Sequence, residues 1–213
     1  WSGLVARAMA QPWFHGWFPW RVASVPVPSR LLIAPHDLRT GDPARAGEFY
    51  AGRFAFAGKL ALTEGVSPFE IAPPSPEWAR ELMSFGWLRH LQAAGTPIAR
   101  AHARALVGDW IALRGPRLPQ AASPDVAARR VMSWLTHSPL ILQDADPSFH
   151  RRFVRCLTGQ VRYLKSVGPS AADGRPRLAC ALALAFAGLC MADQGRLMRT
   201  AQKRLIDELD RQI

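Results

Sequence analysis

Residues 96–113 read TPIARAHARALVGDWIAL, and this stretch decides the fold of the chain. A threonine, which can cap a helix N-terminus, is followed by a proline, which the first helical turn tolerates. Apolar residues then recur at steps of four and three, at positions 99, 103, 106, 110 and 113. That spacing is typical of one buried face of an α-helix. The sequence therefore predicts a helix from Pro97 onward with an apolar stripe toward a core.

The same start signal, a capping residue before proline, recurs along the chain at Asp42-Pro43, Ser75-Pro76, Ser123-Pro124 and Asp146-Pro147. Helical periodicity follows each pair, so helices are expected to begin near each proline. Two further helices are predicted, from near Pro176 to Ala192 and from Arg196 to the end, with Gly195 as the break between them. Successive helices joined by short loops favour antiparallel helical hairpins, so the predicted fold class is mainly α.

Two regions depart from this helical pattern. Residues 53–71 alternate in a way that predicts short β-strands or an irregular insertion. Residues 1–35 are rich in proline and aromatic residues, including Trp13, Trp17 and Trp20, which argues against one regular helix there. We interpret 1–35 as an arm that lies across the main body, with a membrane-surface anchor as the less favoured alternative. Residues 36–213 then form the helical domain, expected to be truncated at its C-terminus.

The charge of the chain points to an anionic partner. Lys and Arg outnumber Asp and Glu by 27 to 16, which gives a formal net charge of +11, and only three of the basic residues are lysines. Arginine presents a planar fork that suits carboxylate and phosphate groups. The composition of a GC-rich genome is the alternative explanation. The predicted helix from Pro147 carries Arg151, Arg155, Arg162 and Lys165 on one face, but no aromatic residues lie among them, so nucleic acid is a less favoured partner.

Other classes of site lack a signal in this sequence. The three cysteines form no CxxC pair, and His90 and His102 have no partner at metal-ligand spacing, so we expect no metal site and no cofactor. The apolar run from Leu178 to Met191 is too short to span a bilayer, so no transmembrane segment is expected.

Several strings, taken together and in order, resemble one protein family. RLLIAPHDLRTGDPARAGEFYAGRFAFAGK (residues 30–59), WARELMSFGWLRHL (78–91) and ARRVMSWL (128–135) resemble the N-terminal helical part of alphaproteobacterial heparinase II/III family proteins. The resemblance covers the chain from about Arg30 to Ile213. It implies part of an incomplete α/α toroid, followed in the full protein by a C-terminal β-sandwich domain as an intramolecular partner. It also implies a location in the periplasm or cell envelope.

The resemblance implies polysaccharide lyase chemistry, which is β-elimination at uronic acid residues. Such chemistry needs a group that neutralises the uronate carboxylate, a base that takes the adjacent proton and an acid for the leaving oxygen. The turn where family members carry an Asn-His pair reads ADGRPR here, residues 172–177, and the chain contains no asparagine. Another residue would have to bind the carboxylate, either Arg175 or Arg177 or a residue outside this sequence. No catalytic residue is carried over, and this part alone is expected to be inactive.

A second set of candidate substrate-binding residues lies in the helix predicted from Pro124. Arg130, Trp134 and His137 are spaced to share one helix face. Charge pairing, ring stacking and a titratable imidazole would together suit an acidic sugar. The alternative, which the pattern favours, is a core tryptophan with an arginine that reaches past it and a histidine at the helix end.

The sequence therefore leaves two functions open. The leading hypothesis is the substrate-binding helical part of a heparinase II/III-like lyase acting on an acidic, uronate-containing polysaccharide. The alternative is a non-catalytic basic helical scaffold that binds an anionic partner, either a cell-envelope polymer or nucleic acid. Whether the full protein is an enzyme is left open by the sequence.

Overall fold

The computed structural model describes residues 25–118 and 120–212. The aromatic residues of the predicted arm, Trp13 to Trp20, lie outside the described residues. The helices are α1 (Ala44–Tyr50), α2 (Pro76–Ser84), α3 (Leu88–Ala94), α4 (Pro97–Ala112), α5 (Pro124–Thr136), α6 (Ser138–Leu142), α7 (Pro147–Val167), α8 (Arg175–Cys190) and α9 (Gly195–Gln212). The strands are β1 (Arg53–Phe56) and β2 (Lys59–Leu62), and short 3-10 turns follow α4 and α7 (Gly115–Arg117 and Gly168–Ser170). The fold is mainly α, as predicted.

The helices begin where the capping pairs predicted. Ser75 Oγ accepts a hydrogen bond from the Trp78 N–H at 3.1 Å, and Thr96 Oγ1 accepts one from the Ala99 N–H at 3.1 Å. Asp146 caps α7 in the same way, through two backbone N–H groups. Ser123 differs, because its hydroxyl donates to Asp125 instead of capping α5. The cap-proline signal therefore fixes the helix starts, even where the side chain has another partner.

The insertion near residues 53–71 is a β-hairpin followed by a loop. Strands β1 and β2 pair antiparallel, with Phe54 opposite Ala61. Ala57 and Gly58 connect them at φ values of 48° and 72°. Two positive φ angles are typical of the tight turn whose twist matches that of the strands.

The predicted break at Gly195 is wrong. Gly195 is the first residue of α9, and the chain turns earlier, between 191 and 194, with Asp193 at a φ of 62°. The cause is tertiary: Leu31 forms an antiparallel bridge with Met191, and the Ala192 N–H donates to the Arg30 carbonyl at 3.1 Å. These backbone hydrogen bonds to a distant segment end α8 at Cys190, five residues before the glycine.

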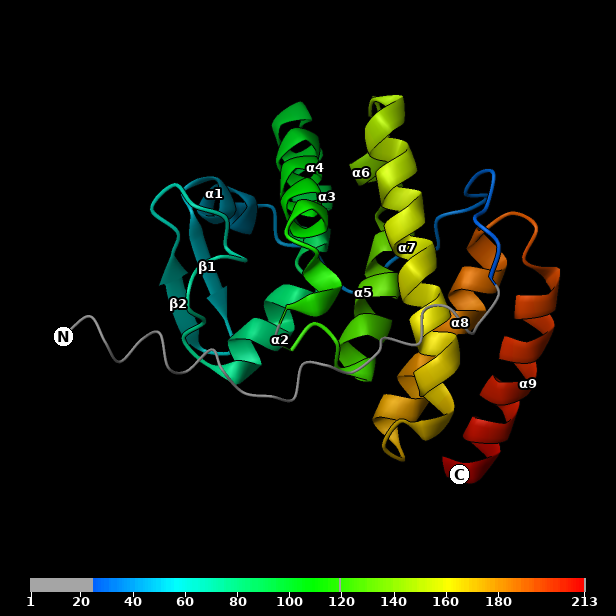
Figure 1. Cartoon of the computed structure of the whole chain (residues 1–213). Helices are drawn as coiled ribbons and strands as arrows, with labels where there is room; N and C mark the ends of the chain where they lie inside the picture. The colour runs from blue at the N-terminus through cyan, green and yellow to red at the C-terminus, as the bar shows by residue number, and fades with distance from the viewer. Residues whose placement is uncertain (1–24, 119, 213) are drawn as a thin grey trace.

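The helices form a row from the β-hairpin to the C-terminus. Figure 1 shows α1 and the hairpin at one end, α4, α5 and α7 in the middle, and the antiparallel α8–α9 hairpin at the other end. Helices α8 and α9 approach closely at Gly188, where an added Cβ would lie 2.7 Å from the Met198 Cα. Residues 25–35, the described part of the predicted arm, run past the α8–α9 corner, where Arg162 of α7 donates to the Val25 carbonyl.

A cluster of aromatic rings fills the middle of the row. Trp110 of α4 meets Trp134 of α5 edge-on at a centroid distance of 5.3 Å, and Phe85 meets both rings edge-on. Phe153 of α7 stacks on Trp134 at 5.0 Å. Such pairs add to the free energy gained from burying the rings. The cluster joins α4, α5 and α7 into one core.

A single charged side chain, Arg130, lies inside this core. Its Nε donates to Gln160 Oε1 at 2.5 Å, and its two terminal nitrogens donate to the Met83 and Ala121 carbonyls at 2.9 and 3.0 Å. The guanidinium also lies 4.4 Å from the centroid of the Trp110 ring. Burial lowers the pKa of Arg130 to about 9, so the group still carries its charge at neutral pH. It is stabilised by carbonyl dipoles and by the face of an indole ring.

We predict that Arg130→Ala lowers the free energy of unfolding by about 3–5 kcal/mol, because it leaves three buried acceptors without a donor. Arg130→Lys keeps the charge but cannot reproduce the fork of donors. Its free energy of unfolding should therefore lie between those of the wild type and Arg130→Ala. Urea denaturation followed by tryptophan fluorescence measures both values. The exposed Arg155 of α7 supplies the control, Arg155→Ala. Equal stability of the Arg130→Ala and Arg155→Ala variants would contradict this account.

The segment before α1 is held on the helices through His90. The Asp42 N–H donates to His90 Nδ1 at 2.9 Å, so that nitrogen must be unprotonated. Gly41 lies so close to α3 that an added Cβ would be 2.5 Å from the Arg89 carbonyl oxygen. Burial, assisted by the positive charges of Arg89 and Arg45, lowers the pKa of His90 to about 4.

This low pKa predicts acid sensitivity. Between the folded pKa of about 4 and the ordinary histidine pKa of 6.5, the folded state binds fewer protons than the unfolded chain. The stabilisation is therefore complete above pH 6.5 and falls as the pH decreases. We expect a loss of about 1–2 kcal/mol between about pH 7 and pH 5. His90→Gln, which cannot titrate, should flatten this dependence in urea denaturation, whereas the exposed His36→Gln should not. His102 and His137 also have lowered pKa values, and their contribution cancels between the variants. If the free energy of unfolding depended on pH equally in the wild type and in His90→Gln, His90 would not be the cause of the acid sensitivity.

Candidate anion-binding site

The structure places the candidate substrate-binding residues of α5 inside the protein. Arg130, Trp134 and His137 do share one side of α5, but their exposed fractions are 1%, 0% and 1%. The Trp134 ring is covered by Phe153 and Phe85, and the Arg130 guanidinium is fully engaged with the core. Neither side chain has surface left for a sugar, so the structure agrees with the alternative of a core tryptophan beside an arginine.

His137 lies against a neighbouring segment of the chain. Its Nδ1 lies 2.8 Å from the Ser133 carbonyl oxygen, so this nitrogen carries a proton and donates it. Its Nε2 faces Asp37 Oδ2 at 3.7 Å. Burial acts against the charge on Asp37, but the hydrogen bonds and charge of Arg39 outweigh it and lower the pKa of Asp37 to about 2. Burial also lowers the pKa of His137. His137 therefore contacts residue Asp37 of this chain and not an open surface.

The second predicted pair lies at the start of α8. Arg175 is the first residue of the helix and is exposed. Arg177 is half-buried, and its Nε and one terminal nitrogen donate to the Ala171 carbonyl at 3.3 and 3.1 Å. Its other terminal nitrogen lies 3.2 Å from Asp173 Oδ1. The structure thus separates the predicted residues into a buried group and a surface pair.

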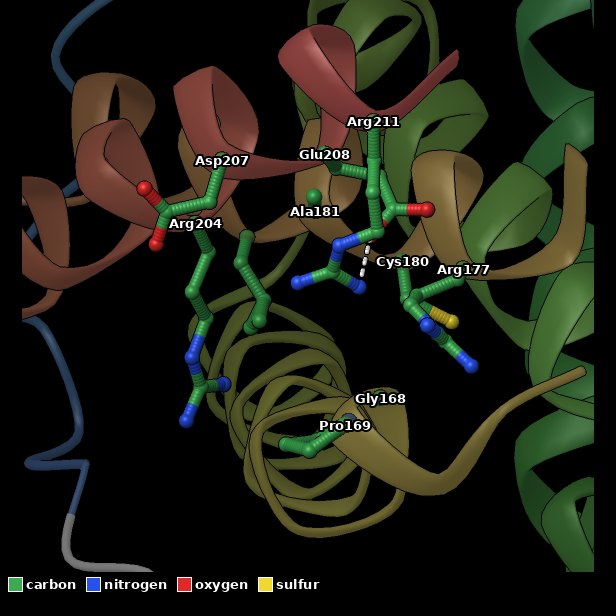
Figure 2. A pocket seen from close by; sticks show the side chains of 10 residues that line it. Gly168, Pro169, Arg177, Cys180, Ala181, Arg204, Asp207, Glu208 and Arg211 are labelled. Atoms are coloured by element: carbon green, nitrogen blue, oxygen red, sulfur yellow. Dashed lines mark hydrogen bonds and ion pairs between the residues drawn. The ribbon is translucent and has the colours of Figure 1, made fainter. Parts of the chain in front are cut away.

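Arg177 also lines a cavity of about 160 Å³ between the end of α7, the first turns of α8 and the last turns of α9. Arg204 and Arg211 of α9 line it as well, together with Asp207 and Glu208. Figure 2 shows the Arg211 guanidinium over the middle of this arginine cavity, with Arg204 on one side of it and Arg177 on the other. Three cations therefore face two carboxylates.

The contacts in the arginine cavity leave positive charge available. Glu208 is buried, and its Oε2 lies 3.3 Å from Arg211 Nη1, so these two charges compensate each other. Arg204 donates to the Lys165 carbonyl at 3.4 Å, which fixes its position without neutralising it. Arg177 is already paired with Asp173, whereas no carboxylate among the described residues forms an ion pair with Arg204. An anionic group that enters the cavity would meet Arg204 and would compete with Asp173 for Arg177, with charge-assisted hydrogen bonds to both arginines.

The arginine cavity offers no nucleophile. Cys180 lies in its wall, and the thiol donates to the Pro124 carbonyl at 3.7 Å. Burial raises the pKa of Cys180 to about 11, so the thiol stays protonated at neutral pH. A protonated thiol is neither a nucleophile nor a good metal ligand. The arginine side chains of this cavity are suited to binding an anion.

Sequence reasoning missed Arg204, Glu208 and Arg211. They were part of the last predicted helix but were not singled out. Their spacing of four and three residues puts them on one helix face, which is the signal that could have identified them. Nothing in the sequence places that face opposite Arg177, because the packing of α9 on α8 decides it.

Two further observations concern other kinds of site. Within residues 25–118 and 120–212, no group of three His, Cys, Asp or Glu side chains is arranged to hold a metal ion. No helix in the described part of the chain combines the length and apolar composition needed to cross a bilayer.

Comparison with known proteins gives one relative. FtsZ-localized protein C of Caulobacter vibrioides is 30% identical over 220 residues, an alignment that covers all of this chain and 37% of the relative. The chain thus spans little more than a third of the length of the curated relative it matches. No protein-family model matches the chain, and no solved structure matches it. The chain is similar over its whole length to part of a larger, FtsZ-localized protein.

Proposed function

We propose that this chain is a non-catalytic helical module of a longer protein that localises with FtsZ, and that its arginine cavity binds an anionic group of a partner. The observation that carries the first part is the 30% identity to FtsZ-localized protein C, which extends over the entire chain. The second part rests on the surplus of arginine in a cavity that has no nucleophile. This proposal follows the alternative drawn from the sequence, a non-catalytic basic helical scaffold, and it names the residues that would bind the anion.

The geometry favours binding over catalysis. A permanent cation such as Arg177 or Arg204 attracts a carboxylate equally well in the ground state and in the transition state of an elimination. Such an interaction improves affinity more than rate. Arg130 and Trp134, which their spacing on one helix face made candidates for substrate binding, are instead buried in the core.

A second candidate keeps the family resemblance. In it, the chain is the helical part of a polysaccharide lyase whose toroid and β-sandwich are completed by residues outside this chain, and the partner is a uronate polymer in the cell envelope. One observation favours this candidate: Arg177 lies in the turn that corresponds to the family's Asn-His position, and it lines the arginine cavity. The base and the acid of the elimination would then come from the rest of the protein.

The anion site is tested by measuring binding of polygalacturonate, heparin and duplex DNA by isothermal titration calorimetry. We predict that Arg177→Ala and Arg204→Ala each weaken binding of the preferred polymer about fivefold at low salt, because each removes one cation from the cavity. The difference should shrink between about 50 and 200 mM salt. Arg199→Ala is the matched control, since Arg199 is exposed on α9 and does not line the cavity.

Equal effects of all three substitutions would mean that net charge alone binds the polymer, and the arginine cavity would be rejected. Preference for polygalacturonate over DNA would support the uronate candidate. The module assignment is tested separately, by imaging a fluorescent fusion of the chain together with labelled FtsZ in a bacterial cell. Coincidence of the two signals at the division site is expected, and a uniformly distributed fusion would contradict the assignment.

A further inference from the structure

A second cleft lies at the opposite end of the row of helices, beside the β-hairpin (Figure 1). Its volume is about 430 Å³, and its walls are the end of α1, the loop 63–68 after β2 and one face of α4. That volume falls within the range of small-molecule sites, which runs from about 300 to 1,000 Å³. The cleft shares no lining residue with the arginine cavity.

Two buried polar atoms in this cleft lack a hydrogen-bond partner among the described residues: Ser67 Oγ and His102 Nε2. An unpaired buried polar group costs about 1–3 kcal/mol, and most such groups in folded proteins are paired. Two of them, from the loop and from α4, line the same cleft. Both atoms are closed to water in the free protein, so a ligand that supplies N–H donors would satisfy them after a rotation of each side chain toward the opening, with His102 in the tautomer whose Nε2 accepts a hydrogen bond.

The charge of the cleft is opposite to that of the chain. Although the formal net charge is +11, the lining contains the carboxylates of Glu64 and Asp109 and no arginine or lysine. Burial lowers the pKa of His102, so the imidazole is neutral at pH 7 and adds no positive charge. A cation is therefore attracted to this part of an otherwise basic protein.

The Tyr50 ring provides aromatic surface in the cleft. Tyr50 is 40% exposed, whereas Phe49, Phe54 and Leu106 lie behind it with 1%, 1% and 5% of their surface exposed. The Tyr50 ring meets the His102 ring edge-on at 5.2 Å, with an interplanar angle of 83°. Aromatic faces attract organic cations, most strongly where water is excluded.

Backbone hydrogen bonds hold the loop in shape without a ligand. The Thr63 N–H donates to the Gly52 carbonyl at 3.0 Å, and the Val66 N–H donates to the Thr63 carbonyl at 2.9 Å. Gly52 has a φ of 69°, and an added Cβ would lie 2.6 Å from Thr63 Oγ1, so glycine is required at this point. A preformed cleft binds a ligand without first ordering its own walls.

We propose that this cleft binds an organic cation, an ammonium or guanidinium group on an apolar body. The N–H groups donate to Ser67 Oγ and His102 Nε2, Asp109 and Glu64 balance the charge, and the Tyr50 ring covers the apolar part. The cation is either a free amine or an arginine or lysine side chain of another protein. This site is independent of the arginine cavity and of the function proposed for it.

The test compares three probes of one shape but different charge: benzylammonium, benzyl alcohol and benzoate. Binding to the whole chain is followed by calorimetry and by the NMR signals of the His102 ring. We expect benzylammonium to bind at least about tenfold more tightly than benzyl alcohol, because only the cation gains from the carboxylates and the aromatic faces. Equal binding of benzylammonium and benzyl alcohol, or no binding of benzylammonium, would overturn the proposal.

Variants then locate the site. Asp109→Asn should weaken benzylammonium binding about threefold to fivefold, as expected for one partly exposed ion pair. Asp210→Asn is the control, because Asp210 is also an exposed aspartate but lies on α9, outside the cleft. Equal affinity of the two variants would refute a role for Asp109 and, with it, the proposed site.

Ser67→Ala separates a ligand-binding role from a structural one. The hydroxyl has no partner within residues 25–118 and 120–212, so its removal should leave the thermal unfolding temperature unchanged or raise it, while benzylammonium binding weakens about threefold. A lower unfolding temperature with unchanged binding would contradict the proposal. Agmatine and an acetylated arginine amide distinguish the two sources of the cation. Tighter binding of the amide points to a protein side chain and tighter binding of agmatine to a free amine, and either ranking supports a cation site.

Discussion

The buried guanidinium of Arg130 is the constraint on which the arrangement of helices depends. It reaches the last turn of α2 through Met83, the loop before its own helix through Ala121, and α7 through Gln160. Because a fork of N–H donors has fixed directions, these elements can pack around Arg130 in one relative placement only. Hydrophobic contacts alone specify packing less sharply, since apolar surfaces slide past one another at little cost. A charge that costs free energy to bury therefore selects one arrangement among several of similar apolar area.

Local sequence signals predicted the elements of this fold well and their contacts poorly. The capping pairs predicted the starts of α2, α4, α5 and α7, because N-cap chemistry involves residues three positions apart. The turn before α9 was placed wrongly, since the hydrogen bonds that end α8 come from Arg30 and Leu31, which lie far away in sequence. Interactions between residues a few positions apart can be predicted from the sequence, whereas interactions that depend on tertiary packing cannot.

The candidate site shows the same division. Arg177 was identified from the sequence, but its neighbours Arg204 and Arg211 lie on α9 and join it only through the packing of that helix on α8. Arg130, Trp134 and His137 were correctly placed on one helix face, yet periodicity cannot tell whether such a face looks toward solvent or toward the core. Here the face is covered by α7 and by Phe85. The distribution of charge was equally hidden: a strongly basic composition contains a cleft lined by acids and one neutral histidine.

The bridge between Leu31 and Met191 sets an order of events during biosynthesis. These residues are separated by most of the described chain, so a ribosome that adds about 5–20 residues per second exposes the first of them roughly ten to thirty seconds before the second is made. During that interval the backbone groups of the segment from Arg30 to Leu32 have no partner on α8. The helices from α1 to α7 can pack in the meantime through contacts closer in sequence, which form faster. The hydrogen bonds between residues 30–32 and the end of α8 therefore form only after α1 to α7 have been synthesised, and until then these backbone groups are open to pairing with other strands.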